Sequence, residues 1–273
     1  MERSPVNSPR PAARQQRAAY WLIDAYARRA HFAPLPGKHA PRSVTEAYAI
    51  QANYVHQKAL LCGPSVGRKI ALSSAAMQTM TGLPTPISGR LHSRQVVRSP
   101  ASVRISDYGR LIVEFEIAIR IDHDLAATGE PYDALSVVKA VGALGPALEL
   151  ADDRNADYAR LAGQGLALIA DNAWNQGAVL GELREDWSRL SINDLAGEAF
   201  INGVSVGRGR GADLMGGPLH ALAWLANQAA GLGDPLRAGE IAILGSMITS
   251  KFPQAGDRVE YRLEGFSPVV LQA

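Results

Sequence analysis

The segment at residues 112–121, which reads IVEFEIAIRI, constrains the fold of this chain more than any other. Its strict alternation predicts a β-strand, because successive side chains of a strand point to opposite faces of the sheet. One face is continuous and apolar and consists of Val113, Phe115, Ile117, Ile119 and Ile121. Glu114 and Glu116 share the other face, with about 7 Å between their Cβ atoms. The strand therefore needs a core on one side and a partner for two carboxylates on the other.

Two carboxylates this close repel each other unless a proton or a cation lies between them. The segment alone leaves two alternatives open, a solvent-facing strand surface balanced by Arg120 or a metal site. A third carboxylate favours the metal site. Glu149 is the only ionisable group in AVGALGPALEL at residues 140–150, and a glutamate in apolar surroundings is costly unless it is paired or coordinated. Three converging carboxylates suit Mg²⁺ or Mn²⁺. An ion pair between Glu149 and an arginine is the alternative.

Two further polar positions stand at apolar segments. Lys69 lies in VGRKIAL, in a chain with only five lysines against 23 arginines. A desolvated lysine can have a lowered pKa and act as a proton shuttle, and the alternative is an edge-strand lysine whose amine reaches solvent. Asp171 and Asn172 end the apolar run LALIADN. We interpret this run as a buried strand whose polar end lines a pocket, although such a pair also starts turns.

The pattern of elements changes along the chain. Helices are predicted at residues 15–30, 43–63, where Ser43 and Glu46 form a capping box, and 218–232. Strand alternation dominates after residue 96, in a style typical of antiparallel sheets. We therefore predict a disordered basic extension at 1–18, a helical N-terminal portion at 19–95 and a β-rich catalytic domain at 96–273.

Charge and composition exclude several classes of protein. Residues 1–42 contain eight basic and two acidic side chains, so +6, and residues 43–273 contain 20 basic and 24 acidic ones, so −4. An acidic body argues against a nucleic-acid binder. No apolar run is long enough to span a membrane. The single Cys62 permits no intrachain disulfide, which fits a reducing compartment. GRGRG at 207–211 imitates a dinucleotide loop only loosely, so we expect no organic cofactor.

Taken together, the segments after residue 18 resemble the 2-keto-4-pentenoate hydratase group of the fumarylacetoacetate hydrolase superfamily. The motifs that carry the resemblance include GRKIALSS (67–74), VEFEIAIRI (113–121), PALELADDR (146–154), IADNAWNQGAVLG (169–181) and LRAGEIAILGS (236–246). The resemblance implies an α+β fold, a mixed β-roll or distorted β-sandwich with flanking helices and a helical N-terminal portion.

The resemblance also implies a site. The family's divalent cation, Mg²⁺ or Mn²⁺, would be held by Glu114, Glu116 and Glu149, with Lys69, Asp171 and Asn172 as catalytic residues. The implied reaction is metal-dependent hydration of a 2-hydroxy-2,4-dienoate to a 4-hydroxy-2-oxo acid in aromatic catabolism. The alternatives are decarboxylation of a 2-oxo-3-enedioate and a redirected or non-catalytic relative that only binds 2-oxo acids. A cytoplasmic homo-oligomer is expected, and the resemblance allows a complex with a paired hydratase or decarboxylase.

The sequence departs from the family pattern in four places. Ala71 stands where many relatives have glycine, Leu244 where threonine is common, and residues 82–91 lack an acidic residue often found after the lysine motif. Trp174 is bulkier than the residue expected there and would narrow the pocket. These changes put the hydration step in question more than metal binding.

Overall fold

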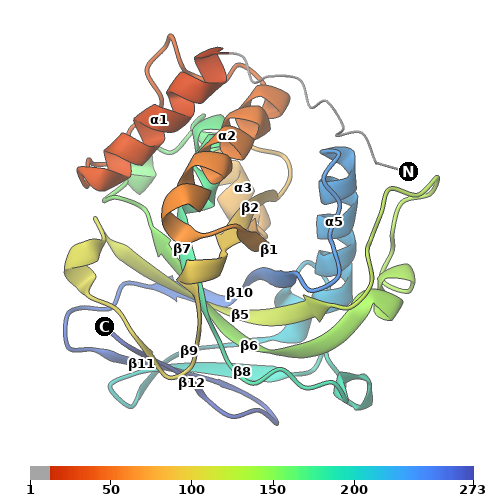
Figure 1. The fold of residues 1–273 in the computed structure, drawn as a ribbon. Helices are drawn as coiled ribbons and strands as arrows, with labels where there is room; N and C mark the ends of the chain where they lie inside the picture. The colour runs from red at the N-terminus through yellow and green to blue at the C-terminus, as the bar shows by residue number, and fades with distance from the viewer. Residues whose placement is uncertain (1–12) are drawn as a thin grey trace.

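Two β-sheets and a set of helices make up the chain in the computed structural model, which describes residues 13–273 (Figure 1). The larger sheet has seven strands in the order β2-β1-β10-β5-β6-β7-β3, and the smaller has five in the order β4-β12-β11-β8-β9. The helices are α1 (Ala13–Ala27), α2 (Val44–Cys62), α3 (Ala75–Thr81), α4 (Gly165–Ala170) and α5 (Pro218–Gly231). The strands of the larger sheet are β1 (Ser65–Ala71), β2 (Ile87–His92), β3 (Val96–Arg98), β5 (Leu111–Ile121), β6 (Val141–Asp152), β7 (Asn175–Leu180) and β10 (Ile241–Lys251). Those of the smaller sheet are β4 (Ala101–Ser102), β8 (Ala196–Ile201), β9 (Val204–Arg210), β11 (Arg258–Leu263) and β12 (Val269–Gln272).

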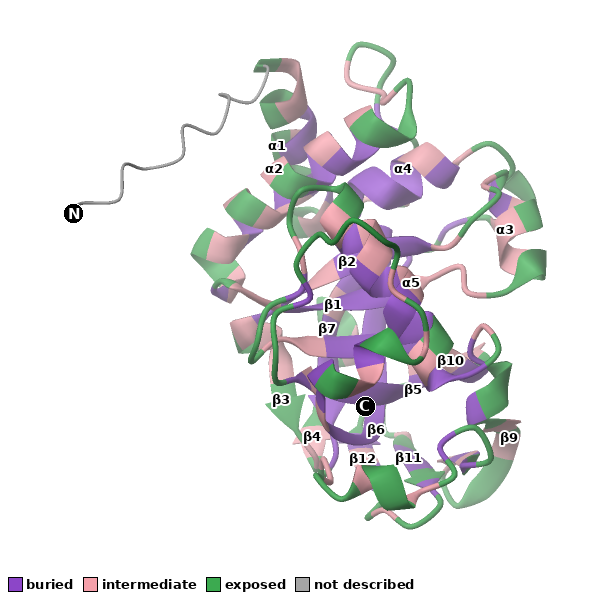
Figure 2. Cartoon of the chain, turned by 90° about the vertical axis from the view of Figure 1, so that its right-hand side faces the viewer, coloured by how far each residue is buried: buried purple, intermediate pink, exposed green. Residues whose placement is uncertain are grey.

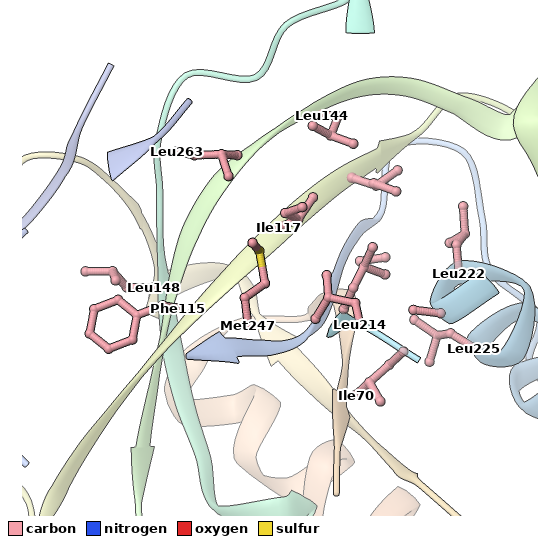
Figure 3. Packing of buried hydrophobic residues seen from close by; sticks show 14 of the residues in the cluster. Ile70, Phe115, Ile117, Leu144, Leu148, Leu214, Leu222, Leu225, Met247 and Leu263 are labelled. Carbon is pink, nitrogen blue, oxygen red and sulfur yellow. The ribbon is translucent and has the colours of Figure 1, made fainter. Parts of the chain in front are cut away.

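The elements form layers. Helices α1, α2 and α3 lie on one side of the larger sheet, and the smaller sheet lies on the other (Figure 1). The main core fills the space between the sheets and includes the apolar face of β5 and residues of α5 (Figure 3). All five predicted members of that β5 face are fully buried. Figure 2 shows that the centre of the larger sheet is buried, whereas the outer surfaces of the helices are exposed. The predicted α+β class is confirmed.

The sheets are mixed rather than purely antiparallel. Strand β1 runs parallel to β10, β3 to β7, and β4 to β12, so the predicted antiparallel style is wrong for these three pairs. Hairpin patterns report only on pairs that are neighbours in sequence, and each of these pairs joins segments far apart in the chain. The hairpin of β8 and β9 does follow the local signal, since Asn202 and Gly203 at its turn both have positive φ.

The predicted helices are present with small shifts. Ser43 caps α2 by accepting a hydrogen bond from the Glu46 amide at 3.1 Å. The Glu46 carboxylate accepts from the Arg42 amide at 2.9 Å instead of the Ser43 amide, so only one half of the predicted capping box forms. Pro218 stands in the first turn of α5. Helix α1 begins at Ala13, so residues 13–18, which we assigned to the disordered extension, are helical. The first turn is fixed by tertiary contacts, because Arg14 forms an ion pair with Glu46 at 3.2 Å. Residues 1–12 lie outside the described residues.

The predicted boundary at residue 95 runs through the larger sheet. Strands β1 and β2 precede it, yet they extend the sheet that β10, β5 and β6 form. The helical character of residues 19–95 is due to α1, α2 and α3. In the described part of the chain, no helix is long and apolar enough to cross a membrane.

Candidate metal and substrate site

Three glutamates from two neighbouring strands meet on the helix side of the larger sheet. Strands β5 and β6 are antiparallel, with Glu114 directly opposite Glu149. One carboxylate oxygen from each of Glu114, Glu116 and Glu149 lies within 4.8 Å of the other two. Glu116 and Glu149 are both 0% exposed, so the alternative of a solvent-facing surface is wrong for this face of β5.

Each carboxylate accepts a hydrogen bond from an uncharged donor that orients it. The Gly245 amide donates to Glu116 Oε2 at 2.7 Å, the Asn175 side chain donates to Glu149 Oε1 at 2.8 Å, and the Ser250 hydroxyl donates to Glu114 Oε1 at 2.6 Å. The second oxygens, Glu116 Oε1 and Glu149 Oε2, are buried and have no hydrogen-bond partner within residues 13–273. A buried carboxylate oxygen without a partner is costly, and coordination of a cation would satisfy it.

The electrostatics of the cluster also fit a divalent cation. Burial and the charges of Glu149 and Glu114 raise the pKa of Glu116 well above its usual range. Burial also raises the pKa of Glu149, although the Lys69 ammonium opposes the shift. Three carboxylates and one ammonium sum to −2, which a 2+ ion neutralises. The donor set consists only of oxygens, as Mg²⁺ and Mn²⁺ prefer.

Lys69 belongs to this cluster. Strand β1 lies between β2 and β10, so Lys69 is not on an edge strand; it is 1% exposed. Its Nζ lies 2.9 Å from Glu149 Oε1, so the partner of Glu149 is a lysine rather than an arginine. Burial lowers the pKa of Lys69, but the charges of the three glutamates outweigh burial and raise it. The pKa of Lys69 is therefore raised rather than lowered in this arrangement.

Asp171 and Asn172 do not join the cluster of glutamates. The run before them forms helix α4 rather than the predicted strand. Asp171 forms an ion pair with Arg154 at 2.6 Å, and both side chains are fully buried. Asn172 accepts a hydrogen bond from the Arg90 amide at 2.7 Å and donates to the Arg90 carbonyl at 3.0 Å. Their side chains therefore tie α4 to neighbouring segments.

A cavity of about 210 Å³ opens beside Glu114. Aromatic rings from three segments line it, namely Tyr158, Trp174 and Phe252, and so do aliphatic side chains that include Leu72, Ile87, Ile112 and Leu168. Thr249 and Ser250 add hydroxyl groups. Within residues 13–273, Glu114 is the one charged side chain that lines it. The cavity can therefore hold a small ligand whose apolar part lies away from the carboxylates.

Trp174 and the other departures from the family pattern lie in or near this site. Trp174 lines the cavity, as expected of a bulky side chain there. Ala71 lines the cavity as well, and so does Ile87 from the segment at residues 82–91. Leu244 is fully buried in the main core, one residue before the amide that donates to Glu116.

Sequence reasoning missed the residues that orient the carboxylates. Ser250 is 136 positions from Glu114 in the sequence, and no local pattern links the two. Gly245 donates through its backbone amide, and because almost every residue type has such an amide, the sequence does not reveal this contact. Asn175 could have been found, since it lies in the same polar stretch as Asp171 and Asn172.

The chain is similar to a described protein family and to named relatives. Residues 48–272 match the family described as fumarylacetoacetate hydrolase C-terminal. The chain is 31% identical over 255 residues to 2-keto-4-pentenoate hydratase of Paraburkholderia xenovorans (strain LB400), covering 93% of each sequence. It is 29% identical over 242 residues to 2-hydroxyhexa-2,4-dienoate hydratase of Comamonas testosteroni, covering 88% of this chain and 90% of that protein.

The fold matches a solved structure over nearly its whole length. The 4-oxalocrotonate decarboxylase of Pseudomonas putida G7, solved in complex with magnesium and adipate, superposes with a TM-score of 0.86 at 24% identity. The match covers 94% of this chain and 96% of that one. The predicted β-roll or distorted sandwich with flanking helices is confirmed as the fold of this family.

Proposed function

Because the chain belongs to the fumarylacetoacetate hydrolase C-terminal family, we propose that it is a divalent-metal-dependent hydratase. It adds water to a 2-hydroxy-2,4-dienoate and yields a 4-hydroxy-2-oxo acid. The observation that carries the proposal is the cluster of a half-buried Glu114 with the buried Glu116 and Glu149, beside an apolar cavity of about 210 Å³. The names of the relatives, 2-keto-4-pentenoate hydratase and 2-hydroxyhexa-2,4-dienoate hydratase, support it.

The three glutamates would hold Mg²⁺ or Mn²⁺. When bound, such a cation supplies the Lewis acidity that stabilises negative charge on the 2-oxygen of a 2-oxo acid. Glu116 and Glu149 can each offer a buried oxygen that makes no hydrogen bond within the described residues. Gly245, Asn175 and Ser250 fix the orientation of the three carboxylates and so reduce the reorganisation that binding requires.

Lys69 is our candidate for the proton shuttle. Its ammonium is buried beside the carboxylates, at 2.9 Å from Glu149, so it can hold a proton at Nζ next to the substrate's acidic end. Gly89 lies opposite it in the sheet, and a Cβ there would meet the Asn172 carbonyl oxygen at 2.8 Å and Lys69 Cε at 3.3 Å. We infer that Asn172 is a positioning residue for Lys69. We infer that Asp171 is also a positioning residue: its ion pair with Arg154 holds the chain directly before Asn172.

The cavity lining favours hydration over decarboxylation of a 2-oxo-3-enedioate. A second carboxylate in this cavity would lose its hydration and meet no cation, which costs several kcal/mol. Arg110 does not line the cavity; its guanidinium packs against two of the lining rings, those of Tyr158 and Phe252, at 5.5 and 5.1 Å. Its charge is balanced by Asp153. An uncharged tail therefore suits the site better than a carboxylate.

The test is an assay of dienol loss. The protein is incubated with 2-hydroxypenta-2,4-dienoate and Mg²⁺, with and without a chelator, and the dienol absorbance is followed. We expect a metal-dependent decrease; its absence would refute the proposal. Release of carbon dioxide from a 2-oxo-3-enedioate would support the decarboxylase instead. Binding of Mg²⁺ and oxalate without turnover of either substrate would indicate a redirected relative.

The physiological metal, homo-oligomerisation, a complex with a paired hydratase or decarboxylase and the cytoplasmic location stay predictions. They derive from the resemblance. Gel filtration with light scattering measures the oligomeric state directly, and a monomer would contradict the predicted assembly.

A further inference from the structure

A second cavity, of about 640 Å³, lies between α2, the β1–β2 pair and the segment after α5. Small and apolar side chains of α2 form one wall and include Ala49, Ala52, Val55 and Ala59. Arg68 of β1 and Arg90 of β2 line it from the sheet. None of the three glutamates or Lys69 lines it, so this cavity is separate from the candidate metal site.

The two arginines form an unusual pair. Arg68 and Arg90 are direct neighbours across the antiparallel β1–β2 ladder, where like charges destabilise a sheet. Both are withdrawn from solvent, with side-chain exposures of 1% and 16%. Burial lowers the pKa of each to about 10. Two desolvated cations in this position require an anion beside them.

Two carboxylates of the protein lie near the pair, but neither is a buried, close partner of both guanidinium groups. Asp234, in the segment after α5, pairs with both arginines through its carboxylate and accepts a further hydrogen bond from Arg68 at its backbone carbonyl, but its side chain is 57% exposed. Glu240 lies 3.9 Å from Arg90, which is too long for a hydrogen bond. The buried Nε of Arg68 has no hydrogen-bond partner within residues 13–273. Donors therefore exceed acceptors at the floor of the cavity.

We propose that this cavity is a binding site for a small organic anion, a carboxylate with an apolar body. A planar carboxylate matches the forked donors of the two guanidinium groups. The apolar body would lie against the wall of α2. Asp234 competes with the ligand, because its exposed carboxylate can turn to water at little cost when another carboxylate takes its place.

Calorimetric titration of the full chain with benzoate tests the proposal. We expect one benzoate per chain, and binding should be unchanged in Glu116→Gln, which separates this site from the metal site. Arg90→Gln should weaken binding by on the order of tenfold or more, since it removes a charge-assisted pair. Asp234→Asn should strengthen binding, because it removes the competing anion. Arg94→Gln, an arginine outside the cavity lining, is the matched control.

Two further measurements separate the parts of the proposal. Ala52→Trp fills the cavity from the exposed face of α2 and leaves both arginines in place, so it should abolish benzoate binding even where Arg90→Gln does not fold. Inorganic phosphate should bind more weakly than benzoate. Equal binding of the two anions would contradict the inference that the ligand has an apolar body. Absence of benzoate binding to the wild type, loss of it in Glu116→Gln, or weaker binding to Asp234→Asn would overturn the site itself.

Discussion

Because side chains alternate between the two faces of a strand, two neighbouring cationic residues of β1 contribute to different sites. On β1, Lys69 points to the three glutamates and Arg68 points to Asp234. Both residues are 1% exposed, so each charge depends on the partners that the fold brings to it. For Lys69 those partners are carboxylates that themselves repel one another. Single substitutions in this cluster should therefore have opposite effects on stability and on metal binding.

Glu116→Gln removes one anion from the cluster. We expect affinity for Mg²⁺ to fall by more than about tenfold, because the site depends on ligand charge. Without metal, the variant should be at least as stable as the wild type, since the raised pKa of Glu116 reports an unfavourable burial of its charge. Calorimetry and chemical denaturation measure the two quantities. Glu130→Gln, at an exposed position, is the control, and unchanged Mg²⁺ affinity in Glu116→Gln would exclude the metal site.

Lys69→Met removes the cation but retains most of the side-chain volume. The metal-free protein should lose about 3–5 kcal/mol of stability, the usual effect of leaving one partner of a buried pair alone. Mg²⁺ should bind at least as tightly, because a competing cation is gone, whereas turnover should fall by about 10²–10⁴. Asn172→Ala should lower turnover less and leave Mg²⁺ affinity intact. Wild-type turnover in Lys69→Met would exclude a catalytic role for Lys69.

At the scale of elements, the segment from α4 to β7 has the most demanding backbone. Asn172, Ala173 and Trp174 have consecutive φ values of 53°, 48° and 63°, which cost roughly 1 kcal/mol or more per residue. The side-chain hydrogen bonds of Asn172 to β2 hold this turn, and so does the edge-on contact of Trp174 with Phe32 at 5.1 Å between ring centroids. The turn directs Trp174 into the cavity.

Helix α2 is tied to β7 by a buried lysine. The Nζ of Lys58 donates to the Asn175 carbonyl at 3.1 Å and to Gln176 Oε1 at 2.9 Å, and it lies over the Tyr26 and Tyr54 rings. No carboxylate pairs with it within the part of the chain that the structure describes. Burial lowers the pKa of Lys58 to about 8.

This shift predicts a pH dependence of stability. Between pH 8 and about 10.4, the unfolded chain keeps the Lys58 proton more often than the folded chain. The free energy of unfolding should therefore rise with pH in this range, by about 3 kcal/mol in all. The raised pKa values of Tyr26 and Tyr54 act in the opposite direction above pH 10, so the useful window is pH 7.5–9.5. Urea denaturation of wild type and Lys58→Met measures the effect, and equal slopes against pH would contradict it.

At the scale of the whole molecule, the candidate metal site joins the central strands. The three proposed ligands come from β5 and β6, and β10 supplies the Gly245 amide. These strands also form the main core between the two sheets. A cation bound there should therefore stabilise the global fold and not only one loop.

Removal of the metal should lower the unfolding temperature. At a free Mg²⁺ concentration of about 100 times the dissociation constant, binding contributes about 2.7 kcal/mol. Calorimetric scans with Mg²⁺ and with a chelator measure the change. Glu116→Gln should show little difference between the two conditions. An equal metal effect in both proteins would place the stabilising ion elsewhere.

The sequence alone determined the local patterns and their chemistry. Alternation placed Glu114 and Glu116 on one face of a strand, and the isolation of Glu149 among apolar residues indicated a partner. The capping box at Ser43 and the first-turn Pro218 located two helices. Each of these depends on residues within a few positions of one another, where spacing maps directly onto geometry.

Only the tertiary structure decided how distant segments meet. It made the apolar part of LALIADN a helix, because a short apolar run fits a buried strand and a buried helix equally well. It paired β1 with β10 in parallel and brought Lys69 to Glu149. It also placed Arg68 opposite Arg90 and paired Asp171 with Arg154. Each of these contacts joins separate segments of the chain, and packing of the whole core, rather than any spacing within a segment, sets their geometry.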